Sequence, residues 1–513
     1  MPRKIFNIAD AISTLCDYAM EKLYLSKIDR IYAENQLLAL FKQSERSEAH
    51  MQELGFQVLL NLMVDYALSK QICTEDETML FEGKIMGLVT PSPNEVISRF
   101  DNIAANEGIE IALQYLNNIS SASNYIRMVD IEKNVRWTAE DLRGDLTITI
   151  NLSKPEKDNK QVLLAKTQPQ TNYPKCPLCL ENVGFSGDMK RAARQSLRVI
   201  PIELAGEDWY FQFSPYVYYE DHCIALSETH RPMSINARTF TRLLDFVDLF
   251  PHYFIGSNAD LPIVGGSILS HDHFQGGKKV LPMLKARSKK WYSNQFNSDV
   301  SVSILDWYNS VILLKGEDRH TLEMLSSTIL EAWREYSDPQ ANIYAKTEKE
   351  PHNTVTPIAT FNDDSTYSIY LILRNNRTDK EHPHGIFHPT EDMHNIKKEG
   401  IGLIEAMGTF ILPGRLFYEK QRIINILTGA DTLNFKAIHE DLQLTSHLPM
   451  IMQLVNDFGT SCSIEKAEEA VVSYINLICK KILDCTAVFK NTSQGECAFE
   501  RFFQSINYHP INF

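Results

Sequence analysis

The stretch that says most about the fold of this chain is Gly265-Gly266-Ser267-Ile268-Leu269-Ser270-His271-Asp272-His273-Phe274-Gln275-Gly276-Gly277. If residues 263–275 are extended, the two-residue period of a strand places His271, His273 and Gln275 on one face and the residues between them on the other. A glycine pair flanks each end, and glycine allows a ligand or a neighbouring backbone to approach closely. The stretch therefore predicts a strand with one chemically active face.

Two imidazoles and an amide in line need partners if they are buried, because an unpaired polar group is costly in a core. Three kinds of chemistry could use them: metal ligation, proton transfer near neutral pH, and attack of a neutral imidazole nitrogen on phosphorus. The last would give a phosphoramidate, which stays reactive because protonated imidazole leaves easily. A His-x-His pair on the surface of a strand, without a chemical role, is the alternative.

A second cluster of reactive side chains is the turn Cys176-Pro177-Leu178-Cys179. One Cys-x-x-Cys pair supplies half of a tetrahedral zinc site, so two more ligands are needed. His230 and His271 are candidates, with His222 as an alternate. The pair could instead be redox active, although no thioredoxin-like pattern surrounds it, or it could be two reduced thiols in a turn.

Composition limits the class of protein. The chain has 513 residues, with 51 Lys and Arg against 65 Asp and Glu, so its formal net charge is −14. Such a chain is a poor candidate for binding nucleic acid, although one local cationic pocket would suffice for a nucleotide substrate. Nine scattered cysteines predict a reducing cytoplasm and no disulfide framework. No stretch approaches about 18 uninterrupted apolar residues, so we expect no membrane span.

Glycine and proline are concentrated in the middle of the chain, which leaves both ends free to form helices. Amphipathic spacing predicts helices near both termini, and residues 237–249 predict another. Between the termini, β-branched and aromatic residues predict strands. These strands are Leu146–Leu152, Trp209–Tyr219, Ile263–Ser270 and Tyr367–Leu373. The pattern is typical of an α+β fold with a mostly antiparallel sheet.

Several common nucleotide and metal motifs do not occur in the sequence. There is no Gly-x-x-x-x-Gly-Lys-Ser/Thr loop and no His-Glu-x-x-His. Gly400-Ile401-Gly402 lacks the third glycine of a dinucleotide-binding fingerprint. The zinc-deaminase pattern also fails, because no His-x-Glu is present.

Residues 271–275, His-Asp-His-Phe-Gln, resemble the His-x-His-x-Gln motif of hexose-1-phosphate uridylyltransferases, a branch of the histidine-triad superfamily. Further stretches are similar to the second, Firmicutes-type class of galactose-1-phosphate uridylyltransferases. They are Ser123–Arg127, Ile148–Asp158, Cys176–Cys179, Ala193–Gln195, Gln212–Tyr216, Ile396–Glu399 and Gly402–Glu405. Their joint occurrence is far more specific than any single motif.

The resemblance implies a ping-pong uridylyl transfer in galactose catabolism. UDP-glucose would give its uridylyl group to the enzyme, and galactose 1-phosphate would then take it to form UDP-galactose. By position in the motif, His273 would be the nucleophile and Gln275 would contact the transferred phosphoryl group. The resemblance also implies substrate contacts, for which the candidates are Asn258, Ser267, Ser270, Arg194 and Arg198. A solvated basic helix face is the alternative for the two arginines.

The same resemblance implies one structural zinc, held by Cys176, Cys179, His230 and His271, and no organic cofactor. It implies two histidine-triad-like antiparallel-sheet halves between helical N- and C-terminal regions. We expect the divisions to be residues 1–135, 136–300, 301–430 and 431–513. The expected partners are UDP-sugars and hexose 1-phosphates, with no nucleic acid and no membrane, and a homodimer as the assembly.

Two other functions remain open from the sequence. A dinucleoside-polyphosphate phosphorylase or nucleotidyl hydrolase of the same superfamily would use the same histidine but pass the group to phosphate or water. A non-catalytic, zinc-stabilised protein would bind nucleotide-sugar without forming an adduct. A second histidine group, His382, His384 and His388, has three interpretations: the decayed triad of a duplicated half, a sugar-phosphate or metal site, or a tight turn.

Overall fold

The fold is built on one sheet of eleven strands, in the order β16-β8-β9-β10-β14-β13-β6-β7-β5-β4-β3. The computed structural model of the chain describes residues 6–47, 49, 51, 54–153, 172–266, 268–294 and 297–511. The strands of the large sheet are β3 (Ile200–Leu204), β4 (Glu207–Phe213), β5 (Cys223–Ser227), β6 (Tyr253–Gly256), β7 (His273–Lys278), β8 (Ser288–Asn294), β9 (Asn297–Leu305), β10 (Val311–Gly316), β13 (Asn353–Phe361), β14 (Tyr367–Asn375) and β16 (His509–Pro510).

Apart from β16 at one edge, the two halves of the sheet have the same strand order, read outward from the centre. Each half has a three-stranded meander, then a helix, then two more strands: β3-β4-β5, α9 (Ala237–Leu249), β6, β7 and β8-β9-β10, α10 (Arg319–Glu335), β13, β14. The halves join where β6 pairs antiparallel with β13, with Gly256 opposite Ile358. Every neighbouring pair in this sheet is antiparallel, which confirms the predicted α+β fold.

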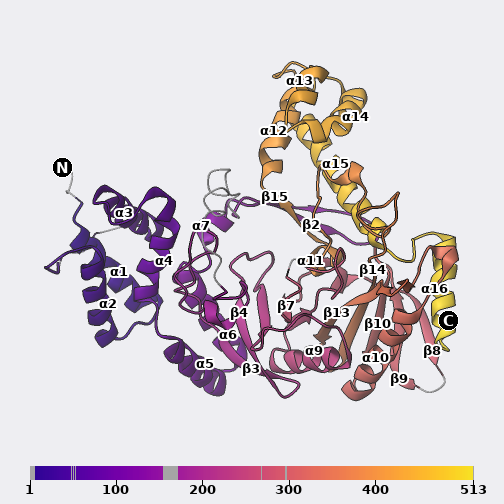
Figure 1. Cartoon of the computed structure of the whole chain (residues 1–513), viewed down its shortest axis with the longest axis horizontal. Helices are drawn as coiled ribbons and strands as arrows, with labels where there is room; N and C mark the ends of the chain where they lie inside the picture. Colours follow the sequence, from indigo (N-terminus) through magenta and orange to yellow (C-terminus); the bar gives the residue numbers. More distant parts are fainter. Residues whose placement is uncertain are drawn as a thin grey trace.

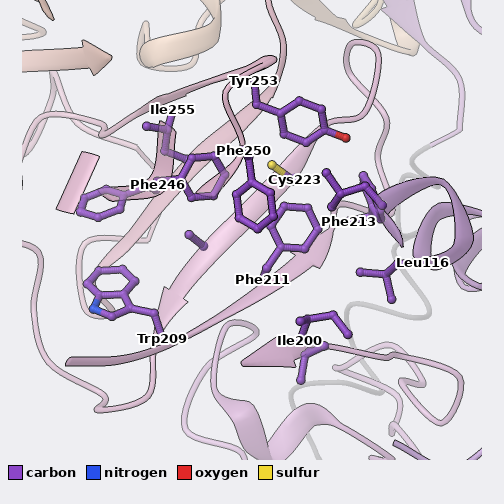
Figure 2. Close-up of a cluster of buried hydrophobic side chains, with 14 of the residues drawn as sticks. Leu116, Ile200, Trp209, Phe211, Phe213, Cys223, Phe246, Phe250, Tyr253 and Ile255 are labelled. Atoms are coloured by element: carbon purple, nitrogen blue, oxygen red, sulfur yellow. The ribbon is translucent and has the colours of Figure 1, made fainter. Parts of the chain in front are cut away.

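One face of the sheet packs on α9 and α10 (Figure 1). Side chains alternate along the strands, so Ile255 of β6 faces this helical layer and its neighbour Phe254 faces the other way. Figure 2 shows aromatic rings of β4 against the end of α9, where the centroids of Phe211 and Phe250 lie 5.2 Å apart. Burial of these large rings is the main stabilising contribution of this layer.

The opposite face carries a second core. It is covered by a small sheet, β1 (Val135–Ala139), β2 (Leu146–Asn151) and β15 (Thr409–Pro413), in which β15 runs parallel to β2. The short α11 (Leu403–Ala406) also lies in this layer, where the Trp307 indole donates to the Ala406 carbonyl at 2.9 Å. β2 and β15 come from opposite ends of the central region, so this layer ties the two halves together.

Helices form both ends of the chain, as predicted. The N-terminal helices are α1 (Ile8–Lys22), α2 (Lys27–Leu40), α3 (Phe56–Ser69), α4 (Thr78–Val89), α5 (Pro93–Glu107), α6 (Ile109–Ala122) and α7 (Met128–Ile131). The later ones are α12 (Arg415–Thr428), α13 (Phe435–Glu440), α14 (Leu448–Phe458), α15 (Ile464–Thr486) and α16 (Ser493–Ser505). Within the described residues, none of the helices combines the length and the apolar character that a membrane crossing requires.

The C-terminal region is not purely helical, because β16 adds a strand to the edge of the large sheet beside β8. Figure 1 shows α13 and α14 standing away from the large sheet, while α15 runs back toward it and α16 lies at its edge. The four-part division of the chain at residues 135, 300 and 430 stays a prediction.

The predicted strand Ile263–Ser270 is wrong, and β7 begins only at His273. Ile263 has a φ of 72°, which an extended strand does not allow. The loop instead folds over Asn258, where a Cβ on Gly266 would lie 2.6 Å from the Asn258 amide nitrogen. The strand predicted to run to Tyr219 also ends early, at Phe213.

Candidate active site and metal centre

Four side chains that are far apart in the sequence converge on one point. One ligand atom from each of Cys176, Cys179, His230 and His271 lies within 4.8 Å of the others. The Cys176 Sγ is 3.5 Å from the Cys179 Sγ and 3.2 Å from the His271 Nδ1, and the Cys179 Sγ is 3.1 Å from the His230 Nδ1. A tetrahedral zinc with bonds of about 2.3 Å to sulfur and 2.0–2.1 Å to nitrogen would separate its ligands by roughly 3.3–3.8 Å.

The backbone of the loop after β5 positions the two histidines of this cluster. After Ser227 the chain runs beside the segment that leads into β7, and three backbone hydrogen bonds link them. These are Ser227 N–H to Asp272 O, Asp272 N–H to Arg231 O, and Met233 N–H to Leu269 O. The rings of His230 and His271 are therefore neighbours, with centroids 4.9 Å apart.

The donor set fits a divalent cation that prefers sulfur and nitrogen. The His271 Nε2–H donates to the Ser227 carbonyl at 2.8 Å, which leaves Nδ1 with its lone pair directed at the cysteines. Burial raises the pKa of the Cys176 thiol, and a cation would reverse that cost by binding the thiolate. The cluster can hold a metal such as zinc. His222, the alternate ligand, lies elsewhere.

His273 begins β7, two residues after His271 of the Cys/His cluster. Its Nδ1–H donates to the carbonyl of His271 at 2.8 Å, so the remaining ring nitrogen, Nε2, carries the lone pair. Nε2 has no hydrogen-bond partner among the described residues. Burial lowers the pKa of His273 to about 4, because desolvation disfavours the imidazolium. The side chain is thus a neutral imidazole with a free nitrogen, which is the form that can attack phosphorus.

Gln275 lies two residues further along β7, on the same face as His273. Its Oε1 is 3.2 Å from the Nε2 of His222, a buried residue just before β5. The amide nitrogen of Gln275 has no partner in the described part of the chain. The predicted alternation holds from His271 onward, since Phe274 points to the opposite face and stacks on Trp209 with centroids 4.8 Å apart.

Asn258 follows β6, the strand next to β7. Its Oδ1 accepts from the Leu403 N–H at 2.8 Å, and its Nδ2 has no partner among the described residues. Ser270 is exposed on the approach to His271. Ser267, the other predicted serine, lies outside the described residues.

The two predicted arginines differ in their surroundings. The Arg194 guanidinium lies over the Tyr125 ring, 5.4 Å from its centroid, and has no carboxylate partner in the described part of the chain. Arg198 is buried and donates to four backbone carbonyls, those of Thr90, Pro91, Gln195 and Leu197. Four of its five N–H donors are thus used by backbone carbonyls, so Arg194 is the more available of the two arginines for a ligand. Neither residue lies in a helix.

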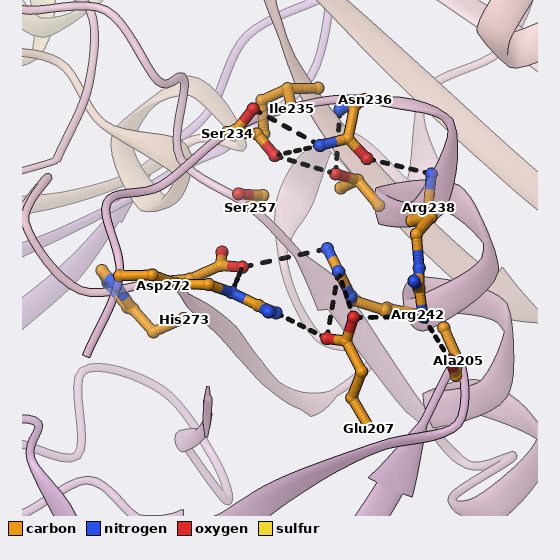
Figure 3. A network of polar contacts seen from close by, with 12 residues as sticks. Ala205, Glu207, Ser234, Ile235, Asn236, Arg238, Arg242, Ser257, Asp272 and His273 are labelled. Atoms are coloured by element: carbon orange, nitrogen blue, oxygen red, sulfur yellow. Dashed lines mark hydrogen bonds and ion pairs between the residues drawn. The ribbon is translucent and has the colours of Figure 1, made fainter. Parts of the chain in front are cut away.

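A network of charged side chains contacts Asp272, on the face of the motif opposite to His273. No pattern in the sequence predicts this network. The Arg231 side chain donates to Asp272 at 3.3 Å and to Glu207 at 2.6 Å, and Arg242 of α9 donates to Glu207 at 3.1 Å (Figure 3). Asp272 is buried, which raises its pKa, while the two arginines favour its ionised form. The residue between the two motif histidines thus anchors β7 to α9. The only indication of this role in the sequence is the strand alternation, which places Asp272 on the face opposite to His271 and His273.

The histidines 382, 384 and 388 all lie in the segment after β14. The strand that corresponds to β7 in the second half is β14, and it contains no histidine. His382 hydrogen-bonds Asp379 at 2.9 Å, and the ring of His384 lies 5.0 Å from that of His394. The interpretation as a decayed triad is therefore wrong, because these residues do not occupy the equivalent strand.

Comparisons with known proteins cover nearly the whole chain. The family described as "Galactose-1-phosphate uridyl transferase, N-terminal domain" matches residues 24–232, and the corresponding C-terminal domain matches residues 246–440. A galactose-1-phosphate uridylyltransferase of Caldanaerobacter subterraneus is 46% identical over 510 residues, which cover 98% of each chain. That of Bacillus subtilis is 41% identical over 98% of this chain and 99% of its own.

Among solved structures, yeast Ap4A phosphorylase Apa2 aligns with a TM-score of 0.31 and 12% identity, over 68% of this chain and 93% of that one. The full-length sequence matches decide the assignment. This chain belongs to the galactose-1-phosphate uridylyltransferase family.

Proposed function

We propose that this protein moves a uridylyl group from UDP-glucose to galactose 1-phosphate through a covalent adduct on the Nε2 of His273. The observation that carries the proposal is the hydrogen bond from His273 Nδ1–H to the His271 carbonyl at 2.8 Å, which leaves Nε2 as the unprotonated nitrogen. Membership of the uridylyltransferase family supplies the class of reaction.

In the first half-reaction the Nε2 lone pair attacks the α-phosphorus of UDP-glucose. The N–P bond forms, and the bond from the same phosphorus to the bridging oxygen breaks with its electron pair, so glucose 1-phosphate leaves. The His271 carbonyl stabilises the positive charge that develops on the ring, because it accepts a hydrogen bond from Nδ1–H throughout.

In the second half-reaction a phosphate oxygen of galactose 1-phosphate attacks the same phosphorus. The P–O bond forms, the N–P bond breaks, and the electron pair returns to Nε2, so UDP-galactose is released and neutral His273 is restored. One site can serve both sugars in turn, which avoids binding two anionic sugar phosphates side by side.

Further residues of the site have proposed roles. The free amide hydrogens of Gln275 and Asn258 would donate to phosphoryl oxygens, since the oxygen of each amide is already held by the protein. Arg194 is the proposed cation for substrate phosphate, because no carboxylate in the described residues neutralises it. Ser270 is a proposed phosphate contact at the entrance to the motif.

The proposed ligands of one structural zinc are Cys176, Cys179, His230 and His271. When bound, such a metal supplies structural rigidity by fixing the loop from β5 and the start of β7. His271 links this role to the chemistry, because its ring faces the cluster while its carbonyl orients His273.

The deciding measurement is the intact mass of the purified protein after mixing with UDP-glucose. We expect a gain of one uridylyl group in the wild type and none in His273→Asn. A wild-type protein that binds UDP-glucose without any gain in mass would overturn the proposal in favour of a non-catalytic nucleotide-sugar-binding protein.

The acceptor is tested on the isolated adduct. Galactose 1-phosphate should discharge the uridylyl group as UDP-galactose, whereas inorganic phosphate and water should leave the adduct largely intact over the same time. Faster discharge by phosphate would instead indicate a phosphorylase.

A further inference from the structure

His222 is a buried histidine that the proposed reaction does not use. The residue is buried, at 3% relative exposure. Its Nε2 lies 3.2 Å from the Oε1 of Gln275, and its Nδ1 is buried without a hydrogen-bond partner within the described residues. A buried polar ring with one orphaned nitrogen costs stability, so it calls for a reason.

The surroundings settle which nitrogen carries the proton. A proton on Nδ1 would be a buried donor with no acceptor, which is more costly than a buried lone pair. Burial also lowers the pKa of His222 to about 4, so the ring carries a single proton at neutral pH. That proton is on Nε2, and it is donated to the Gln275 Oε1.

This hydrogen bond also settles the orientation of the Gln275 amide. With Oε1 held by His222, the amide nitrogen and its two hydrogens point away from His222, and no described residue accepts them. Without the bond the amide could rotate and present its oxygen, which would repel a phosphoryl oxygen.

The His222 ring is itself held in place. Its backbone continues the β4–β5 ladder, since the Ser214 N–H donates to the His222 carbonyl at 2.8 Å. The ring stacks on Tyr218 with centroids 5.3 Å apart and an interplanar angle of 23°, and it lies 4.6 Å from the Tyr219 ring. A donor held at the entrance to a strand and against aromatic rings loses little entropy when it makes its bond.

We infer that His222 is a positioning residue for uridylyl transfer, which fixes the Gln275 amide so that its N–H groups face the transferred phosphoryl group. The inference rests on the proposed function and adds a residue to it. It assigns His222 a role through Gln275, and none in metal binding or in contact with the substrate.

A double-mutant cycle tests the inference, with the single-turnover rate of adduct formation from UDP-glucose as the measured quantity. Gln275→Ala should slow this step by about 100-fold, the scale for losing one preorganised donor. His222→Phe keeps an aromatic ring but removes the donor, and it should slow the step by roughly 10-fold. In the Gln275→Ala background, His222→Phe should have no further effect, because the group it positions is absent.

Two further variants keep the result interpretable. His222→Gln can still present an N–H₂ group, so it should recover most of the rate that His222→Phe loses. His352→Phe is the matched control, because His352 is also buried and also bonds an amide oxygen, that of Asn376 at 2.9 Å, outside the site. It should form the adduct at the wild-type rate.

The inference would be overturned if His222→Phe forms the adduct as fast as the wild type, or if its effect multiplies with that of Gln275→Ala. It is also overturned if His222→Phe and His222→Gln are folded and equally slow. A failure of the proposed function looks different, because then the wild-type protein itself forms no adduct.

Discussion

Strands β7 and β14 occupy equivalent places in the two halves of the sheet, yet one carries polar side chains and the other apolar ones on the corresponding face. On the face away from α9 and α10, β7 presents His273 and Gln275, whereas β14 presents Tyr370 and Ile372 to a buried apolar core. The backbone frame is repeated, and the side chains on it are not.

The difference shows what each half contributes. In the second half the face is closed by α11 and the small sheet, so it adds stability through apolar burial. In the first half the face is lined by polar groups that are held from behind, by the Asp272 network and by the cluster of Cys176, Cys179, His230 and His271. The two halves thus share a backbone arrangement, and the proposed site lies on the first of them.

The largest effect expected is the loss of the nucleophile on β7. His273→Asn should lower uridylyl transfer by on the order of 10⁴-fold or more, the scale for removing a nucleophile, while the protein stays folded. The check is the steady-state rate together with the melting temperature. A folded variant with wild-type turnover would remove the chemical distinction between the two strands.

Removal of one cluster ligand should have the next largest effect. Cys176→Ser should weaken metal binding by about 100-fold or more, since even the loss of an outer-shell partner costs 10- to 100-fold. The metal content found by elemental analysis and the melting temperature should both fall. The rate of uridylyl transfer should fall as well, because His271 orients His273. Cys497→Ser, at an exposed thiol, is the control. Wild-type protein purified with no metal would count against the zinc assignment.

A gentle change in β14 should affect stability and not chemistry. Ile372→Val removes one buried methylene from the second core and should cost about 0.5–1.5 kcal/mol of unfolding free energy. The urea midpoint measures this, and the rate of adduct formation per folded molecule should not change. A slower adduct at unchanged stability would mean that β14 takes part in the site.

The smallest effect is expected in the histidine group after β14. The His382 side chain is half-exposed and bonds only Asp379 among the described residues, so His382→Ala should change stability by less than about 0.5 kcal/mol. Adduct formation should stay at the wild-type rate. A large loss of activity would show that the second half also contributes chemistry.

Local patterns predicted much of this fold. The helix expected over residues 237–249 is α9 with the same limits, because an amphipathic stripe and the Asn236 N-cap agree on where it begins. The strand predicted over Ile263–Ser270 is wrong, because it depended on hydrophobic composition alone. There the left-handed Ile263 and the packing of Gly266 on Asn258 produce a loop. Contacts distant in sequence hold both in place, since Gly385 and Gly400 lie against Ile263 and the Leu403 N–H donates to Asn258.

The residues alone suggested the Cys176 and Cys179 pair with His230 and His271 as candidate ligands and His222 as an alternate, and the resemblance selected the first four. Cys179 and His230 are 51 positions apart. Spacing alone cannot show that the loop after β5, which carries His230, will meet the turn that carries the cysteines. The surroundings of Arg198 and His222 could not be predicted for the same reason. Arg198 donates to the distant carbonyls of Thr90 and Pro91, and His222 bonds Gln275, 53 positions away, and no local pattern indicates these contacts.

The sequence by itself determined the class of fold, the helical ends, the reactive motif and the family, because these depend on periodicity and on short strings of residues. Only the tertiary structure decided that the two halves of the sheet have the same strand order, which histidine nitrogen is free, and which arginine is more available to a ligand. Those facts follow from the pairing of strands far apart in the chain and from the burial it creates. A hydrogen bond to a distant carbonyl, such as that from His273 to His271 once the loop is folded, selects the tautomer on which the chemistry depends.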